Sequence, residues 1–159
     1  MLPPGAEVSL DGAPLGRGSQ TIAAASRDGA AHVLAAAAPG FESAEWRVPP
    51  GGLAGVRVGL ALRPEGYPGK VELDDPAVLV RVADFLAASG RPGEAQAYAA
   101  RAASLEPELA AAQRSLGIAA VQAGDRRTAQ RSFAEYLRLA PDAPDADEIE
   151  AALARLAGE

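Results

Sequence analysis

The sequence predicts an α+β protein in which a small all-β, sandwich-like domain is followed by an all-α array of helical hairpins. Two observations indicate this: the spacing of the apolar residues changes from alternating to helical near residue 65, and the residues beyond that point repeat at an offset of 34. A chain of 159 residues is long enough for two small domains. We expect these at 1–64 and 75–159, joined by a linker at 65–74 that is rich in proline and glycine.

Short apolar stretches between glycines and prolines predict the strands of the first domain. They lie at 8–10, 21–22, 32–34, 41–48 and 56–62. Alternation is clearest in the last stretch, where Val56, Val58 and Leu60 fall on one face. Asp11-Gly12 and Pro39-Gly40 have the turn chemistry of hairpin corners. We therefore expect a small antiparallel sheet or sandwich with one buried face.

The second domain opens with a clear helix start. Asp75 has the side chain of an N-cap, Pro76 suits the first helical position, and Gly90 marks the end of the helix. Between them the apolar residues follow a helical stripe.

Residues of the second domain recur 34 positions apart. The aligned pairs are Gly90 with Gly124, Ala95 with Ala129, Leu105 with Leu139, and Pro107 with Pro141. Each unit contains two helices around a glycine turn, so the units 76–109 and 110–143 predict two stacked hairpins. A further apolar stripe at 149–156 predicts a terminal capping helix.

The second unit resembles the tetratricopeptide (TPR) repeat. The matching residues are Leu116-Gly117, Gly124, Ala129, Phe133 and Pro141. The first unit departs from the pattern, with Leu79 in place of Trp, Ala83 in place of Gly and Ala99 in place of an aromatic residue. The resemblance implies a helical array that binds proteins or peptides.

The first domain resembles the PEGA domain, a small all-β bacterial module. The motifs that carry the resemblance are Pro4-Gly5-Ala6-Glu7-Val8, Leu10-Asp11-Gly12, Leu15-Gly16, Gly29 before His32-Val33, Pro39-Gly40-Phe41 and the strand at 56–62. The usual Thr-Pro after Leu15-Gly16 is replaced by Arg17-Gly18-Ser19. The resemblance implies a non-enzymatic module of envelope or multidomain signalling proteins.

Composition excludes several kinds of chemistry. The chain has no cysteine and a single histidine, His32, so zinc clusters and cysteine nucleophiles are excluded. A net charge of −6 lacks the basic signature of nucleic-acid binding, and no apolar run approaches the length of a membrane span. We therefore expect no enzyme activity, no cofactor and no metal site.

Four local motifs have both a functional and a structural interpretation. We expect His32 to be a structural strand residue, the segment 16–19 to be a turn rather than a phosphate loop, and the acids between 142 and 150 to form a solvated helix start rather than a calcium loop. Phe41 and Trp46 are odd-spaced in one expected strand, and we expect at least one in the core.

Arg126, Arg127 and Arg131 lie near the start of an expected helix, where the first two oppose the helix dipole. A solvated face and a patch for an acidic partner both stay open as explanations.

The function expected from these features is that of a non-catalytic scaffold in a bacterial envelope or signalling assembly. The alternative is an accessory sensory or docking tail of a larger enzyme, such as a Ser/Thr protein kinase. The first expected strand follows the start of the chain almost directly. We therefore expect either part of a longer, periplasmic or envelope-associated protein, or a cytoplasmic one.

The resemblance to TPR repeats also implies where a protein or peptide segment would bind. The first helix of each hairpin would line the concave surface, which places Arg81, Asp84, Ala87, Ala88, Arg114, Ser115, Ile118, Val121 and Gln122 on it. The alternative that this face is solvated or covered by the β domain stays open. Because two hairpins leave an outer face to be covered, the β domain or a second copy in a homodimer is expected there.

Overall fold

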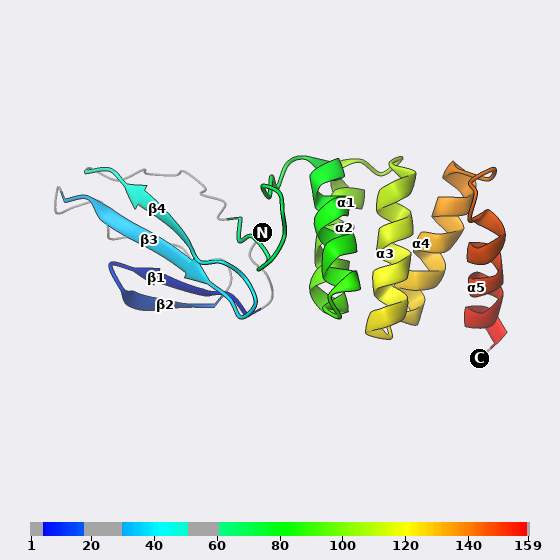
Figure 1. The fold of residues 1–159 in the computed structure, drawn as a ribbon, viewed down its shortest axis with the longest axis horizontal. Coiled ribbons are helices and arrows are strands. Elements are labelled where there is room, and N and C mark those ends of the chain that lie inside the picture. Colours follow the sequence, from blue (N-terminus) through cyan, green and yellow to red (C-terminus); the bar gives the residue numbers. More distant parts are fainter. Residues whose placement is uncertain (1–4, 18–29, 51–60, 159) are drawn as a thin grey trace. The chain divides into compact units, whose positions relative to one another are not determined.

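The structure is a computed structural model that describes residues 5–17, 30–50 and 61–158. It divides into two compact units, Met1–Val71 and Glu72–Glu159, so the division falls within the stretch 65–74. Among the described residues, the first unit contains a four-stranded antiparallel sheet and the second contains five helices (Figure 1). The predicted α+β fold, with strands first and helices second, is confirmed.

The sheet has the strand order β2-β1-β3-β4 (Figure 1). Its strands are β1 (Glu7–Leu10), β2 (Ala13–Arg17), β3 (His32–Ala37) and β4 (Ala44–Val48), and each neighbouring pair is antiparallel. The strand expected at 21–22 and most of the strand expected at 56–62 lie outside the described residues.

One face of the sheet carries the core of this unit. Val8, Leu34 and Val48 are buried together, and the partly buried Leu10 and Trp46 pack against them. The register explains this grouping, because Leu10 lies opposite Leu34 and Leu34 lies opposite Trp46. Because side chains alternate along each strand, the residues between these positions lie on the other face of the sheet.

Asp11 holds the β1–β2 turn against the start of β3. Asp11 and Gly12 have φ angles of 49° and 80°, which suit a tight hairpin turn. One carboxylate oxygen of Asp11 accepts a hydrogen bond from the Val33 backbone N–H at 2.8 Å, and the other lies 2.6 Å from Nδ1 of His32. His32 therefore has a structural partner, in agreement with the interpretation from the sequence.

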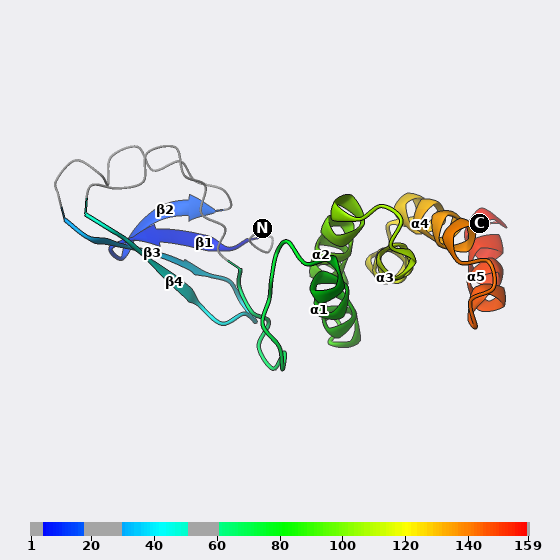
Figure 2. The ribbon, with the colours of Figure 1, turned by 90° about the horizontal axis from the view of Figure 1, so that it is seen from above.

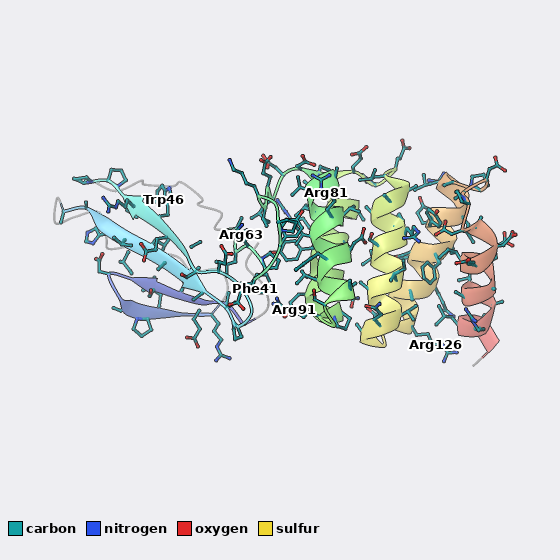
Figure 3. All side chains as sticks on the ribbon, viewed as in Figure 1. Phe41, Trp46, Arg63, Arg81, Arg91 and Arg126 are labelled. Atoms are coloured by element: carbon teal, nitrogen blue, oxygen red, sulfur yellow. The ribbon has the colours of Figure 1, made fainter. Side chains whose placement is uncertain are left out.

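Two details of this unit differ from the expectations. Gly16 and Arg17 belong to β2 and pair with Val8 and Glu7, so this part of 16–19 is strand rather than turn. Phe41 precedes β4 and forms an isolated bridge with Pro64. Phe41 is buried and Trp46 is half-buried, so the prediction that at least one reaches the core is confirmed (Figure 3).

The second unit consists of α1 (Pro76–Ala88), α2 (Pro92–Leu105), α3 (Ala110–Ala123), α4 (Arg126–Leu139) and α5 (Ala146–Gly158). Asp75 caps α1 by accepting a hydrogen bond from the Val78 backbone N–H at 3.0 Å. Gly90 and Gly124 follow α1 and α3 with φ angles of 72° and 77°, a left-handed conformation that favours glycine.

Each helix packs against the next one in the chain, and α1 also packs against α3 (Figures 1 and 2). The starts of α1 and α2 at residues 76 and 92 correspond to those of α3 and α4 at residues 110 and 126, which reproduces the offset of 34. Two successive reversals bring α3 back to the direction of α1. The first helices of the two hairpins are therefore neighbours in one layer.

Gly117 allows α3 and α4 to approach closely. A Cβ atom at this position would overlap the Phe133 ring, which is only 2% exposed. In the first hairpin the equivalent positions are Ala83 and Ala99, both buried. The larger aromatic side chain in the second hairpin is thus matched by the loss of a methyl group on the facing helix.

Helix α5 covers α4 with its apolar side. Ile149 is buried in a cluster with Phe133 and Tyr136, and Ala152, Leu153 and Leu156 pack against this cluster. Its opposite side is polar, with Asp147 and Glu150 exposed. A helix with one apolar and one polar side is suited to end a stack, as the sequence predicted.

Substitution of Gly117 by alanine should destabilise the full-length protein by about 1–3 kcal/mol, because the added methyl group overpacks the contact with Phe133. Urea unfolding followed by circular dichroism measures this. In a Phe133→Leu background the same substitution should cost less, because the smaller side chain leaves room.

Gly93→Ala is the matched control, because a Cβ atom there meets nothing within 4 Å. It should leave stability unchanged or raise it by up to about 1 kcal/mol through helix propensity. Equal stability of the Gly117→Ala and Gly93→Ala variants would contradict the proposed close packing.

Candidate functional site

The residues that the sequence placed on a binding surface lie on the two neighbouring helices α1 and α3. Five of them have exposed side chains: Arg81, Asp84, Ala88, Val121 and Gln122. Arg81 projects from α1 (Figure 3) and forms no hydrogen bond or ion pair with any residue in the described part of the chain. Val121 is 44% exposed, a high value for a valine side chain. We call these five exposed residues of α1 and α3 the α1/α3 face.

Asp84 joins the two helices of this face. The Ser115 hydroxyl on α3 donates a hydrogen bond of 2.5 Å to Oδ1 of Asp84 on α1. Ser115 is only 4% exposed, so its role is to fix α1 against α3 rather than to contact a partner. Asp84 itself stays exposed and can accept further hydrogen bonds.

Arg114 belongs to a polar cluster that fixes the start of α5. Its Nε donates a hydrogen bond of 2.5 Å to Oδ2 of Asp145, and the Tyr136 hydroxyl donates one of 2.5 Å to Oδ1 of the same carboxylate. Asp145 thus ties α3 and α4 to the chain that enters α5. The sequence placed Arg114 on the binding surface, but its guanidinium already binds the carboxylate of Asp145.

The same contacts shift the acidity of the three groups. Hydrogen bonds from Tyr136 and Arg114 lower the pKa of Asp145 below its ordinary value. The hydrogen bond to Asp145 raises the pKa of the Tyr136 hydroxyl and that of the Arg114 guanidinium. All three shifts favour the charged form of Asp145 together with protonated Tyr136 and Arg114, which is the state that holds the cluster together.

Ile118 does not lie on the binding surface, where the sequence placed it. It is half-buried and packs against the apolar cluster of Phe133, Tyr136 and Ile149. Ile118 therefore contributes to the core between α3, α4 and α5. Of the two apolar side chains expected on the binding surface, only Val121 is available to a partner.

One of the arginines at the start of α4, Arg126, has an explanation that the sequence did not reveal. Arg126 Nε and Gln130 Nε2 both donate hydrogen bonds of 2.8 Å to the Leu156 backbone carbonyl near the end of α5. Carbonyl groups at a helix end attract cations. Arg126 opposes the dipole of its own helix but favours that of the antiparallel neighbour, which the sequence alone could not indicate.

The acids between 142 and 150 also divide into different roles. Asp145 is bound to Tyr136 and Arg114, whereas Asp147 and Glu150 are exposed at the start of α5. Within residues 5–17, 30–50 and 61–158, no group of three or more potential metal ligands is found. None of the helices in these ranges is both long and apolar enough to cross a membrane.

Substitution of Asp145 by asparagine should destabilise the protein by about 1–2 kcal/mol at neutral pH, because the charge-assisted hydrogen bond from Arg114 is lost. The folded-state pKa of Asp145 is lowered, so its contribution is present above the unfolded value of about 4 and is lost as the pH falls through the lower folded value. Urea unfolding at neutral and acidic pH should therefore show that the two proteins converge at low pH.

Glu148→Gln is the control for this experiment, because Glu148 is an exposed acid in the first turn of the same helix. Its removal should cost a few tenths of a kcal/mol, the ordinary size of an interaction with the helix dipole. A cost for Asp145→Asn as small as that of the control, or one that does not change with pH, would contradict the role of the cluster.

Comparison with models of protein families finds no match to the chain, and neither does comparison with curated proteins. The resemblances to PEGA and TPR modules therefore stay predictions from motifs. The fold is supported by the structure itself: the antiparallel sheet, the two hairpins offset by 34 residues and the helix that ends the stack.

Proposed function

We propose that the helical unit is a non-catalytic protein-binding module that holds a peptide or protein segment on the α1/α3 face. In this proposal the whole chain acts as a scaffold, in line with the envelope or signalling modules that its two halves resemble. The regular stacking of helices supports it, because such stacks present side chains of neighbouring helices on a fixed surface.

The observation that carries this proposal is the exposure of two different kinds of side chain on adjoining helices. Arg81 offers a guanidinium that has no hydrogen bond or ion pair among the described residues, and Val121 offers apolar surface that is 44% exposed. The Asp84–Ser115 hydrogen bond fixes the helices that carry them. A partner would therefore meet a rigid surface without having to order it first.

The chemistry of the face favours a segment that combines an acidic and an apolar residue. The guanidinium of Arg81 can bind a carboxylate through two parallel hydrogen bonds. Around Val121 the surface is small and neutral, with Gln122 beside it and Ala88 exposed on α1. Because only two first helices contribute, we expect an affinity of about micromolar order unless several contacts act together.

Site-specific photo-crosslinking tests this function in the full-length protein. A photoreactive residue at Gln122 should capture a partner from a lysate of the source organism. The same residue at Ala100, which is exposed on α2, serves as the control. Capture that is specific to position 122 supports the proposal, and equal capture from both positions contradicts it.

The double substitution Arg81→Ala and Val121→Ala should reduce capture from position 122 at least tenfold, while the circular dichroism spectrum stays unchanged because both side chains are exposed. Arg138→Ala is the matched control, since Arg138 is an exposed arginine on α4. If the control reduces capture as much as the double substitution does, the binding surface lies on α4 instead.

A further inference from the structure

Arg114 borders the α1/α3 face and binds an acid of its own chain. It lies on α3 seven residues before Val121, so about two helical turns separate the two residues on one side of the helix. The pKa of the Arg114 guanidinium is raised mainly by the hydrogen bond to Asp145, and the negative charge of Asp84 adds to the shift. Arg114 is therefore near both the exposed Asp84 of the face and the internal Asp145.

The side chain of Arg114 is only partly covered by this contact. It is 42% exposed, whereas the side chain of Asp145 is 20% exposed. The hydrogen bond to Oδ2 of Asp145 comes from Nε of Arg114. A guanidinium also carries N–H donors on its two terminal nitrogens. A second carboxylate can therefore reach Arg114 from solvent.

The helical repeat does not require an ion pair at this junction. The residues 34 positions before Arg114, Tyr136 and Asp145 are apolar: Val80, Ala102 and Ala111. Val80 and Ala102 are buried, so the junction of α1, α2 and α3 is packed by apolar side chains. The charged pair is therefore a feature of the second unit, which the packing of the first unit does without.

We propose that Asp145 is a built-in competitor for the carboxylate of a partner and so limits the affinity of the α1/α3 face for acidic segments. This role rests on the proposed function and concerns the regulation of the same surface. While Asp145 neutralises Arg114, a carboxylate of the partner is attracted by Arg81 but little by Arg114. A partner that binds Arg114 exchanges one charged hydrogen bond for another and gains little from it.

Tyr136 strengthens the competition by holding Asp145 in place. Its hydroxyl donates a hydrogen bond of 2.5 Å to Oδ1 of Asp145. Tyr136 is only 5% exposed, so the packing around its ring fixes the position of the hydroxyl. The carboxylate of Asp145 is thus held from two sides, by Tyr136 and by Arg114, and a carboxylate of a partner lacks the first of these donors.

Binding of a synthetic peptide to the full-length protein tests the proposal. The probe is a rhodamine-labelled hexapeptide of alternating aspartate and leucine residues, and fluorescence anisotropy in about 0.05 M NaCl measures its dissociation constant. The Asp145→Asn variant should bind it about three- to tenfold more tightly than the wild type, because a negative charge a few ångströms from the bound carboxylate is removed. Unchanged or weaker binding by this variant would overturn the proposal.

Asp147→Asn is the matched control, because it removes an exposed aspartate near the start of α5 and changes the net charge equally. It should bind the peptide like the wild type. An equal gain in both variants would show that net charge governs the affinity, and would overturn the proposal. In an Arg114→Ala background the substitution Asp145→Asn should no longer strengthen binding. A gain that persists without Arg114 would also overturn the proposal.

Tyr136→Phe provides a test that leaves the net charge unchanged. It keeps the buried ring but removes the hydroxyl that holds Asp145. Binding of the acidic peptide should strengthen by about twofold, less than in Asp145→Asn, because Asp145 stays charged but is held from one side only. Circular dichroism confirms that the variants are folded. If Asp145→Asn does not fold, the absence of any gain in Tyr136→Phe overturns the proposal.

The results separate this role of Asp145 from the proposed function. If Arg81→Ala/Val121→Ala weakens binding of the peptide but Asp145→Asn does not strengthen it, the α1/α3 face is a binding surface and Asp145 is no competitor. If the acidic peptide binds neither the wild type nor Asp145→Asn, the role of Asp145 is overturned, and crosslinking from Gln122 still decides the proposed function.

Discussion

Close contact between helices is the constraint on which the helical unit depends. The chain contains 39 alanines but only seven aromatic residues, so its core gains little from large side chains. Apolar burial then requires backbones to approach closely, which small residues permit. The contact of Gly117 with Phe133 is the clearest case, because glycine leaves the space that the aromatic ring fills. The exposed α1/α3 face exists because α1 and α3 are held by such packing beneath it.

Polar contacts then determine how the stack ends. Asp145 joins Arg114 and Tyr136 to the entry of α5, and Arg126 with Gln130 binds the carbonyl near its other end. With both ends fixed, the apolar side of α5 covers α4 and its polar side faces outward.

Much of the fold could be predicted from the sequence because its signals are local. The cap at Asp75, the glycine after each first helix and the offset of 34 all follow from backbone requirements that nearby residues reveal. The strand at β2 was missed because Ala13–Arg17 contains proline and glycine and has no alternating apolar pattern. Its pairing with β1 follows from the tight turn at Asp11-Gly12, where a hairpin requires a second strand.

The candidate site was only partly predictable, because helical spacing shows which residues share a face but not which partners they meet. Arg114 and Ser115 were placed on the correct helix, yet their partners Asp145 and Asp84 lie 31 residues away in the chain. The sequence placed Ile118 on the binding surface. Its contact with the cluster of Phe133, Tyr136 and Ile149 could not be predicted, because it depends on where α5 packs against α4. Arg81, Val121 and Gln122 were predicted to lie on the surface, and their side chains are exposed.

Hydrogen exchange of the full-length protein tests the central claim, that closely packed helices form one cooperative stack, most directly. The buried amides of α3 and α4 should be the slowest to exchange, and α1, α2 and α5 should open with them under mild denaturant. Exchange of α4 and α5 at a rate independent of α1 to α3 would contradict the account, because it would show that the contact of Gly117 on α3 with Phe133 on α4 does not join α4 and its capping helix to the rest of the stack.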